Sequence, residues 1–172
     1  ASILSQMLQE LAYDRGHHVK CHIQRNVGGN TDFLNMENKD RLASKKISKE
    51  NVIRSQNDIR GLPQENTFFH AGPSEYIRYY GDNKVANIHM EMEGFMGAPV
   101  VLDAQLSVID SPNSAGVVMD AIRYLMVARE IGIVGSLRGP SAFTQKTPPQ
   151  QLSFEEAKKE CIRLSNRNTL FG

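Results

Sequence analysis

The sequence predicts an α+β fold, in which a mixed or antiparallel sheet packs against helices. Apolar residues recur with a helical period at the start of the chain and again after residue 110, whereas three segments between them alternate with a period of two. The alternate positions of those segments are polar, so one sheet face is expected to be buried and the other to meet water or a partner. A chain of 172 residues can bury the core of one compact unit.

An amphipathic helix and a strand are expected first. Ser2 is the candidate N-cap of the helix, and Gly16 is its candidate stop. The apolar stripe of this helix consists of Ile3, Met7, Leu8, Leu11 and Ala12. The strand that follows is expected to bury its apolar positions, which are Val19, Cys21 and Ile23.

Two further alternating segments predict a β-hairpin. Their apolar positions are Ala86, Ile88, Met90 and Met92 in the first, and Leu102, Ala104, Leu106 and Val108 in the second. Residues 94–99 join them and contain two glycines and a proline, which predicts an antiparallel pair with a longer connecting loop.

Two helices are expected after the hairpin. Ser111 and Pro112 can start the first, and Gly132 can end it. Its apolar stripe consists of Val117, Val118, Ala121, Ile122 and Leu125. Residues 135–150 are rich in Gly and Pro and are expected to form a loop, after which Ser153 to Glu156 form a capping box for a polar helix that reaches about Leu164.

The charge balance excludes several function classes. The chain has 20 Lys and Arg against 19 Asp and Glu, whereas proteins dedicated to nucleic acids or membrane surfaces need a basic excess. Its apolar runs are shorter than the roughly 18 residues of a membrane-spanning helix, and no leader pattern opens it. Two distant cysteines give neither a disulfide framework nor a metal pair. We therefore expect a soluble, cytoplasmic protein with no nucleic-acid or membrane partner.

Residues 39–60 form a candidate anion-binding segment, with seven basic and three acidic residues. Lys45 and Lys49 are four positions apart, so in a helix they share one face and can converge on a phosphate or an oxyanion. Ser48 can cap a helix that begins at Lys49, which would direct backbone N–H groups to the same place. A solvated basic face is the alternative interpretation.

Shorter signals place polar side chains at turns, in loops and at helix starts. They follow a glycine pair after the first strand, enter the hairpin, open the helix after it, and precede two prolines in the late loop. The residues are Asn30, Asp32, Asp82, Lys84, Asp110, Ser111 and Lys146. Taken one at a time, they are also explained by plain turns, surface ion pairs or simple capping.

Several known site signatures are absent from the sequence. No pair among the five histidines has the spacing of metal ligands, so no metal site is expected from the residues. The phosphate-binding Walker loop, the GxSxG elbow and the GxGxxG dinucleotide fingerprint are also missing.

Taken in order, the polar segments resemble one enzyme family. The chain reads NVGGNTDFLNM at 26–36, SKKISK at 44–49, GDNK at 81–84, DSPNSAG at 110–116 and KTPP at 146–149. This series resembles the archaeal and bacterial branch of the myo-inositol-1-phosphate synthase family, whose members are also called inositol-3-phosphate synthases. The likeness extends from Ala1 to about Gln150.

The resemblance implies an isomerase that converts glucose 6-phosphate to myo-inositol 1-phosphate with NAD, the first step of inositol biosynthesis. In that reaction C5 is oxidised, a proton leaves C6, C6 joins C1 in an aldol-type closure, and hydride returns to C5. An enolate and an alkoxide oxygen develop on the way, and lysines are suited to stabilise both. Some members of this branch depend on a divalent cation, and the resemblance leaves that requirement open here.

The resemblance also implies roles for individual residues. The catalytic residues are Lys45, Lys84, Lys146, Asp82 and Asp110. The substrate-binding residues are Lys49, Ser48, Ser111 and Asn30. The cofactor would lie against Asn30, Asp32 and Asp110.

The implied architecture has two domains in a homotetramer. Residues 1–18 would end an NAD-binding Rossmann domain, 19–110 would form a catalytic and oligomerisation domain similar to the C-terminal domain of glyceraldehyde-3-phosphate dehydrogenase, and 111–172 would be a helical return to the Rossmann domain. The chain lacks the dinucleotide fingerprint, so it is expected to be inactive in isolation. The alternatives are a non-catalytic module for phosphosugar binding or oligomerisation and, with weaker support, a polyanion-binding protein that uses residues 39–60.

Overall fold

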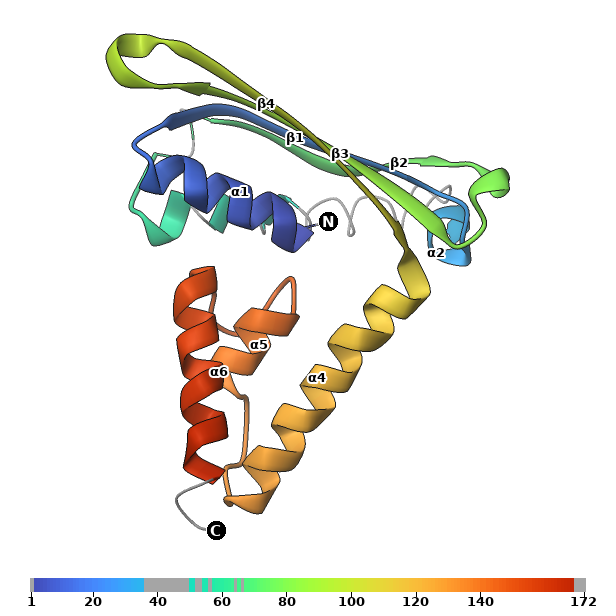
Figure 1. Ribbon diagram of the computed structural model, residues 1–172, viewed down its shortest axis with the longest axis vertical. Helices are drawn as coiled ribbons and strands as arrows, with labels where there is room; N and C mark the ends of the chain where they lie inside the picture. Colours follow the sequence, from blue (N-terminus) through green and yellow to red (C-terminus); the bar gives the residue numbers. More distant parts are fainter. Residues whose placement is uncertain are drawn as a thin grey trace. The chain divides into compact units, whose positions relative to one another are not determined.

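The computed structural model describes residues 2–35, 50–51, 54–55, 57–63, 65 and 67–168. The first unit, which ends at Asp110, contains α1 (Ser2–Asp14), β1 (His18–Gly28), α2 (Thr31–Leu34), β2 (Phe68–Tyr76), η3 (Arg78–Tyr80), β3 (Asn83–Glu93), η4 (Phe95–Gly97) and β4 (Pro99–Ile109). The second unit begins at Ser111 and holds nearly all of α4 (Asp110–Glu130), together with α5 (Arg138–Thr144) and α6 (Phe154–Asn168) (Figure 1).

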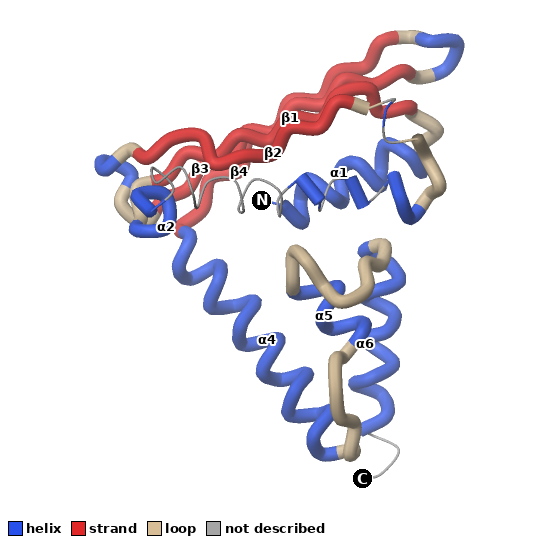
Figure 2. Tube along the Cα trace, turned by 180° about the vertical axis from the view of Figure 1, so that it is seen from behind, coloured by secondary structure: helices blue, strands red, loops and turns tan. Residues whose placement is uncertain are grey.

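The first unit is built on a four-stranded sheet with the order β2-β1-β3-β4. β2 runs parallel to β1, and the other neighbours are antiparallel. Asn83 pairs with Ile109 and Glu93 pairs with Pro99, so β3 and β4 form the expected hairpin, whose connection contains η4. The mixed sheet and the helix on its face confirm the predicted α+β class (Figure 2).

β2 is a strand that the sequence did not predict. It lies at the edge of the sheet, pairs only with β1 among the described residues, and contains Gly72 and Pro73. A proline cannot donate a ladder hydrogen bond, so it is tolerated in an edge strand but disrupts the pattern by which strands are found in sequence. The expectation of three strands was therefore one short.

The buried face predicted for β1 was wrong beyond its first residues. Val19 is fully buried, but the next buried side chains are His22, Gln24 and Asn26, whereas Cys21 and Ile23 are only half-buried. Val19 pairs with Met92 and Cys21 with Glu91, so the residue between Val19 and Cys21 is an extra one in a β-bulge. One extra residue reverses which alternate positions face the core.

The helix α1 packs on the sheet with a partly polar face, and only Leu8 and Ala12 of the predicted apolar stripe contact the core. Ser5 and Gln9 are fully buried, while Ile3, Met7 and Leu11 are exposed. Polar side chains are buried here because β1 presents polar groups that need hydrogen-bond partners. The described helix begins at Ser2, so this residue lies inside the helix rather than capping it.

A hydrogen-bond network joins α1 to the sheet. Ser5 Oγ lies 2.6 Å from His22 Nε2, and Gln9 Oε1 lies 3.0 Å from His22 Nδ1. Gln9 Nε2 donates to Asn57 Oδ1 at 3.2 Å, and Asn57 Nδ2 donates to Thr67 Oγ1 at 3.3 Å. The apolar core beside this network consists of Ala12, Val19, Ile88, Met90 and Met92.

The second unit contains the two predicted helices and one that was not predicted. α4 starts at Asp110, so Ser111 is helical rather than its N-cap, and Gly132 follows the end of the helix with a φ of 74°. The apolar stripe of α4 is largely exposed. α5 falls in the stretch expected to be a loop and packs against α6.

The capping box of α6 is confirmed. Glu156 N donates to Ser153 Oγ at 3.3 Å, and Ser153 N donates to Glu156 Oε2 at 3.3 Å. The helix continues to Asn168, beyond the predicted end at Leu164. None of the described helices combines the length and the apolar character needed to cross a membrane.

Candidate functional site

Three predicted polar residues of the first unit, Asn30, Lys84 and Asp110, meet at one end of the strands. Gly28, the last residue of β1, pairs with Lys84 near the start of β3, and Lys84 pairs with Val108 near the end of β4. Because β3 is antiparallel to both neighbours, the end of β1, the start of β3 and the end of β4 lie at the same end of the sheet. Asn30 comes two residues after β1 and Asp110 comes directly after β4, so both are brought close to Lys84.

Asp110 is the centre of this cluster. Lys84 Nζ donates to Asp110 Oδ1 at 3.0 Å, and Asn30 Nδ2 donates to Asp110 Oδ2 at 3.1 Å. The Lys84 and Asp110 side chains are 21% and 23% exposed, so the ion pair is partly shielded but open to a ligand. Asp110 N also donates to the carbonyl oxygen of Asp82 at 2.9 Å, so the backbone of Asp82 supports the site.

The Asn30 side chain is held at both ends. Its Oδ1 accepts hydrogen bonds from the backbone N–H groups of Asp32 at 3.1 Å and Phe33 at 3.3 Å, which caps α2. Its Nδ2 is the donor to Asp110. The Asp32 side chain is exposed in the first turn of α2. The amide of Asn30 therefore fixes the carboxylate that in turn holds the Lys84 ammonium.

The glycine pair before Asn30 makes a close backbone contact with another segment of the chain. A Cβ atom added to Gly29 would lie 2.5 Å from both the Ile77 carbonyl oxygen and the Gly81 nitrogen. Ile77 N donates to the Gly28 carbonyl oxygen at 2.9 Å. Gly29 therefore allows the loop after β1 to approach the turn that precedes β3.

The remaining predicted residues lie outside the described residues or in the second unit. Lys45, Ser48 and Lys49 lie outside the described residues. Ser111 is the second residue of α4, and its carbonyl oxygen accepts a hydrogen bond from Ser114 Oγ at 2.9 Å. Lys146 is exposed in the second unit, between α5 and α6.

The metal-ligating side chains of the described residues do not gather into a group. Within the part of the chain that the structure describes, no group of three or more His, Cys, Asp or Glu side chains could hold a metal ion. The chemistry it offers is that of an ammonium group oriented by a carboxylate. An ammonium has three N–H donors, so Lys84 can stay paired with Asp110 and still donate to an oxygen of a ligand.

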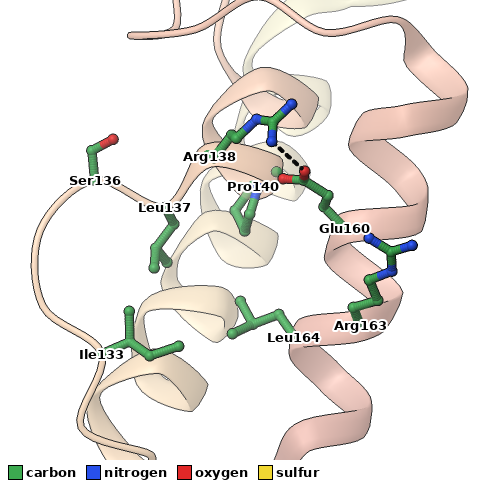
Figure 3. Close-up of a pocket in the computed structure, with 9 residues that line it drawn as sticks. Ile133, Ser136, Leu137, Arg138, Pro140, Glu160, Arg163 and Leu164 are labelled. Carbon is green, nitrogen blue, oxygen red and sulfur yellow. Dashed lines mark ion pairs between the residues drawn. The ribbon is translucent and has the colours of Figure 1, made fainter.

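A pocket of about 250 Å³ in the second unit was missed by the sequence reasoning. Figure 3 shows its apolar lining from Ile133, Leu137 and Leu164, with Arg138 and Glu160 at one side. Arg138 Nη1 and Glu160 Oε1 form an ion pair at 3.2 Å. Because this pocket depends on the packing of α5, which was expected to be a loop, no signal in the sequence could have found it.

Residues 1–111 match the family model of myo-inositol-1-phosphate synthase. The chain is 39% identical over 162 residues to the inositol-3-phosphate synthase of Mycolicibacterium smegmatis, which covers 93% of the chain and 44% of that protein. It is 41% identical over 160 residues to the inositol-3-phosphate synthase of Mycobacterium tuberculosis, with 93% of the chain and 43% of that protein covered. The chain thus spans less than half the length of these relatives.

Solved structures share the fold. A myo-inositol-1-phosphate synthase-related protein from Thermotoga maritima superposes with a TM-score of 0.74 at 27% identity, covering 96% of this chain and 43% of the other. The inositol-3-phosphate synthase of Caenorhabditis elegans superposes with a TM-score of 0.76 at 18% identity, covering 97% of this chain and 36% of the other.

Proposed function

Because the chain belongs to the myo-inositol-1-phosphate synthase family, we propose that it is the catalytic portion of an enzyme that converts glucose 6-phosphate to myo-inositol 1-phosphate with NAD. Relatives named inositol-3-phosphate synthase support this reaction. The observation that carries the proposal is the Lys84 ammonium, held 3.0 Å from Asp110 at a sheet edge where a ligand can reach it.

Lys84 would act on an oxygen of the sugar that becomes negatively charged. In this reaction an enolate oxygen develops at C5, and an alkoxide develops at C1 on ring closure. A preorganised ammonium stabilises such an oxygen more than it stabilises the neutral ground state, and loss of one such donor costs about 3 to 4 kcal/mol in the barrier. Asp110 keeps the ammonium in place, and Asn30 keeps Asp110 in place.

The other lysines have proposed roles that come from the family resemblance. Lys146 would share the charge at the C5 and C1 oxygens with Lys84, and Lys45 would act at the C1 oxygen or in the transfer of the C6 proton. Lys49 would bind the phosphate. Further polar contacts to the substrate, or support for the lysines, are assigned to Ser48, Ser111 and Asp82.

NAD would lie against Asn30, Asp32 and Asp110. The fit is partial. These side chains offer an amide and two carboxylates at one end of the strands, but the sequence has no fingerprint for the dinucleotide phosphates. When bound, NAD would accept a hydride from the sugar and return it in the same turnover. The phosphates of NAD are therefore assigned to a Rossmann domain outside this chain, and a divalent-cation requirement stays open.

The exposed apolar side chains support a larger assembly. Val118, Ile122 and Leu125 of α4 are all exposed, which supports packing of residues 111–172 on the Rossmann domain. Val101 and Ile109 are exposed on the sheet face that α1 does not cover, which supports a homotetramer contact through residues 19–110. We assign residues 19–110 the architecture of the glyceraldehyde-3-phosphate dehydrogenase C-terminal domain. Residues 1–18 are assigned to the end of the Rossmann domain, and the whole enzyme is assigned to the cytoplasm.

Replacement of Lys84 in the full-length enzyme tests the proposal. We expect Lys84→Ala to lower the rate of inositol phosphate formation by about 100- to 1000-fold, with an unchanged far-ultraviolet circular dichroism spectrum. Lys20→Ala is the matched control, because Lys20 also forms an ion pair, with Glu93, but at the opposite end of the strands. Near-normal turnover by Lys84→Ala would refute the assignment.

A non-catalytic phosphosugar-binding or oligomerisation module is the second candidate function. The observation that supports it is the Lys84 ammonium, which is paired with Asp110 at 3.0 Å and can donate to an oxygen of a sugar phosphate without a redox partner. Calorimetric titration of the native protein with glucose 6-phosphate and with NAD separates the two candidates. Binding of the sugar phosphate with no affinity for NAD would favour the module.

A further inference from the structure

The loop after β1 and the turn before β3 approach each other closely through backbone atoms. A Cβ atom on Gly29 would lie 2.5 Å from the Ile77 carbonyl oxygen and from the Gly81 nitrogen, whereas ordinary contacts of a Cβ atom begin at 3.4 Å. A side chain at Gly29 would therefore require the two segments to separate by about 0.5 Å to reach 3.0 Å, the shortest contact that Cβ atoms show, and by about 0.9 Å to reach an ordinary contact. Gly81 has φ 54° and ψ −124°, a conformation that residues with side chains rarely adopt, so the turn is itself specified by a glycine.

Hydrogen bonds on both sides of this contact connect it to the site. Ile77 N donates to the Gly28 carbonyl oxygen at 2.9 Å, just before Gly29. The turn then leads through Asp82, whose carbonyl oxygen accepts from Asp110 N at 2.9 Å, to Lys84. The residue after Gly29 is Asn30. The glycine contact thus sets the separation between the segment that carries Asn30 and the segment that carries Lys84.

The polar contacts of the site leave little room for such a separation. Asn30 Nδ2 lies 3.1 Å from Asp110 Oδ2, near the upper end of the range of about 2.7 to 3.2 Å for N–H···O hydrogen bonds. An added 0.9 Å would break this bond or pull Asp110 away from Lys84. A displacement of about 1 Å in a catalytic group can cost roughly 100-fold in rate.

We propose that Gly29 is a positioning residue, whose missing side chain lets the loop after β1 and the turn before β3 close to the distance at which Asn30, Asp110 and Lys84 engage one another. Its effect on catalysis rests on the proposed function. The role assigned to Gly29 rests on its backbone contact with Ile77 and Gly81. It acts through the spacing of the two segments.

Gly29→Ala in the full-length enzyme is the first test. We expect kcat to fall about 100-fold while KM for glucose 6-phosphate changes less than about threefold, because the phosphate contacts are assigned to other residues. Gly72→Ala is the matched control, since its Cβ atom would have no heavy atom nearer than 3.6 Å, and it should keep wild-type kcat. If Gly29→Ala fails to fold, Gly81→Ala is the second variant: its Cβ atom has no heavy atom within 4 Å, but φ 54° disfavours a side chain, so the turn that contacts Gly29 should shift and kcat should fall.

Amide hydrogen exchange on the same variants is the second test, and its readout does not depend on activity. We expect Gly29→Ala to speed exchange at the Ile77 and Asp110 amides, while the Ile88 amide in the middle of β3 stays protected. Unchanged exchange at Ile77 and Asp110, or a wild-type kcat in Gly29→Ala, would overturn the positioning role alone. A wild-type enzyme that forms no inositol phosphate would overturn the proposed function, and with it any positioning role in that reaction.

Discussion

Buried His22 is expected to make the first unit lose stability in acid. Its ring is enclosed between α1 and the sheet, with Nε2 2.6 Å from Ser5 Oγ and Nδ1 3.0 Å from Gln9 Oε1. Burial lowers the pKa of His22 from 6.5 to about 4. The unfolded chain therefore takes up a proton at higher pH than the folded chain does, so the stabilising contribution is complete above pH 6.5 and falls as the pH is lowered toward 4. A pKa difference of this size corresponds to a loss of roughly 3 kcal/mol.

Urea unfolding followed by circular dichroism, at several pH values between neutral and mildly acidic, measures this loss. His22→Gln is the matched variant, because glutamine retains polar atoms in the network and does not titrate. Other groups titrate equally in both proteins, so the difference between their unfolding free energies isolates His22. We expect wild type to lose roughly 2 to 3 kcal/mol more than His22→Gln on acidification. Parallel losses in the two proteins, or an imidazole NMR titration of His22 near pH 6.5, would refute the reasoning.

Two further predictions concern an exposed histidine and a helix cap. Hydrogen bonds that the His89 ring donates to the Asp103 and Glu91 carboxylates raise the pKa of His89, so its stabilising contribution is present below pH 6.5 and lost as the pH rises through the folded pKa. Wild type should therefore exceed His89→Gln in unfolding free energy in mild acid and approach it in alkali, which urea unfolding measures; equal pH dependence would contradict this. Ser153→Ala removes the capping box and should destabilise α6 by about 1 kcal/mol, seen as faster amide exchange in its first turns, whereas Ser165→Ala within the helix should have a smaller effect.

The hairpin and the long helices could be predicted because local patterns determine them. β3 and β4 alternate cleanly and are joined by one short connection, and α6 begins at a capping box. The buried face of β1 could not be predicted, because a single extra residue after Val19 reverses the alternation. β2 was missed because its glycine and proline interrupt the pattern, and its partner strand is distant in sequence.

About half of the candidate site follows from the same local patterns. The hairpin register alone places Lys84 and Asp110 at the same end of the β3–β4 hairpin, since Asn83 pairs with Ile109. The presence of Asn30 beside them depends on β1 lying antiparallel to β3, which no alternation pattern reveals. The contact of Gly29 with Gly81 is also long-range: each glycine is visible as a turn signal, but their proximity is a property of the fold.

The polar face of α1 and the geometry of the site are linked through the register of β1. With His22, Gln24 and Asn26 facing α1, the strand needs polar partners, and Ser5 and Gln9 supply two of them for His22. A shift of one residue would bring Cys21 and Ile23 inward, leave Ser5 and Gln9 without these partners, and turn every later side chain of the strand to the other face. Since Asn30 comes two residues after this strand, the same shift would move the Asn30 side-chain amide away from Asp110. The buried hydrogen bonds to His22 therefore select the register in which Asn30 Nδ2 lies 3.1 Å from Asp110.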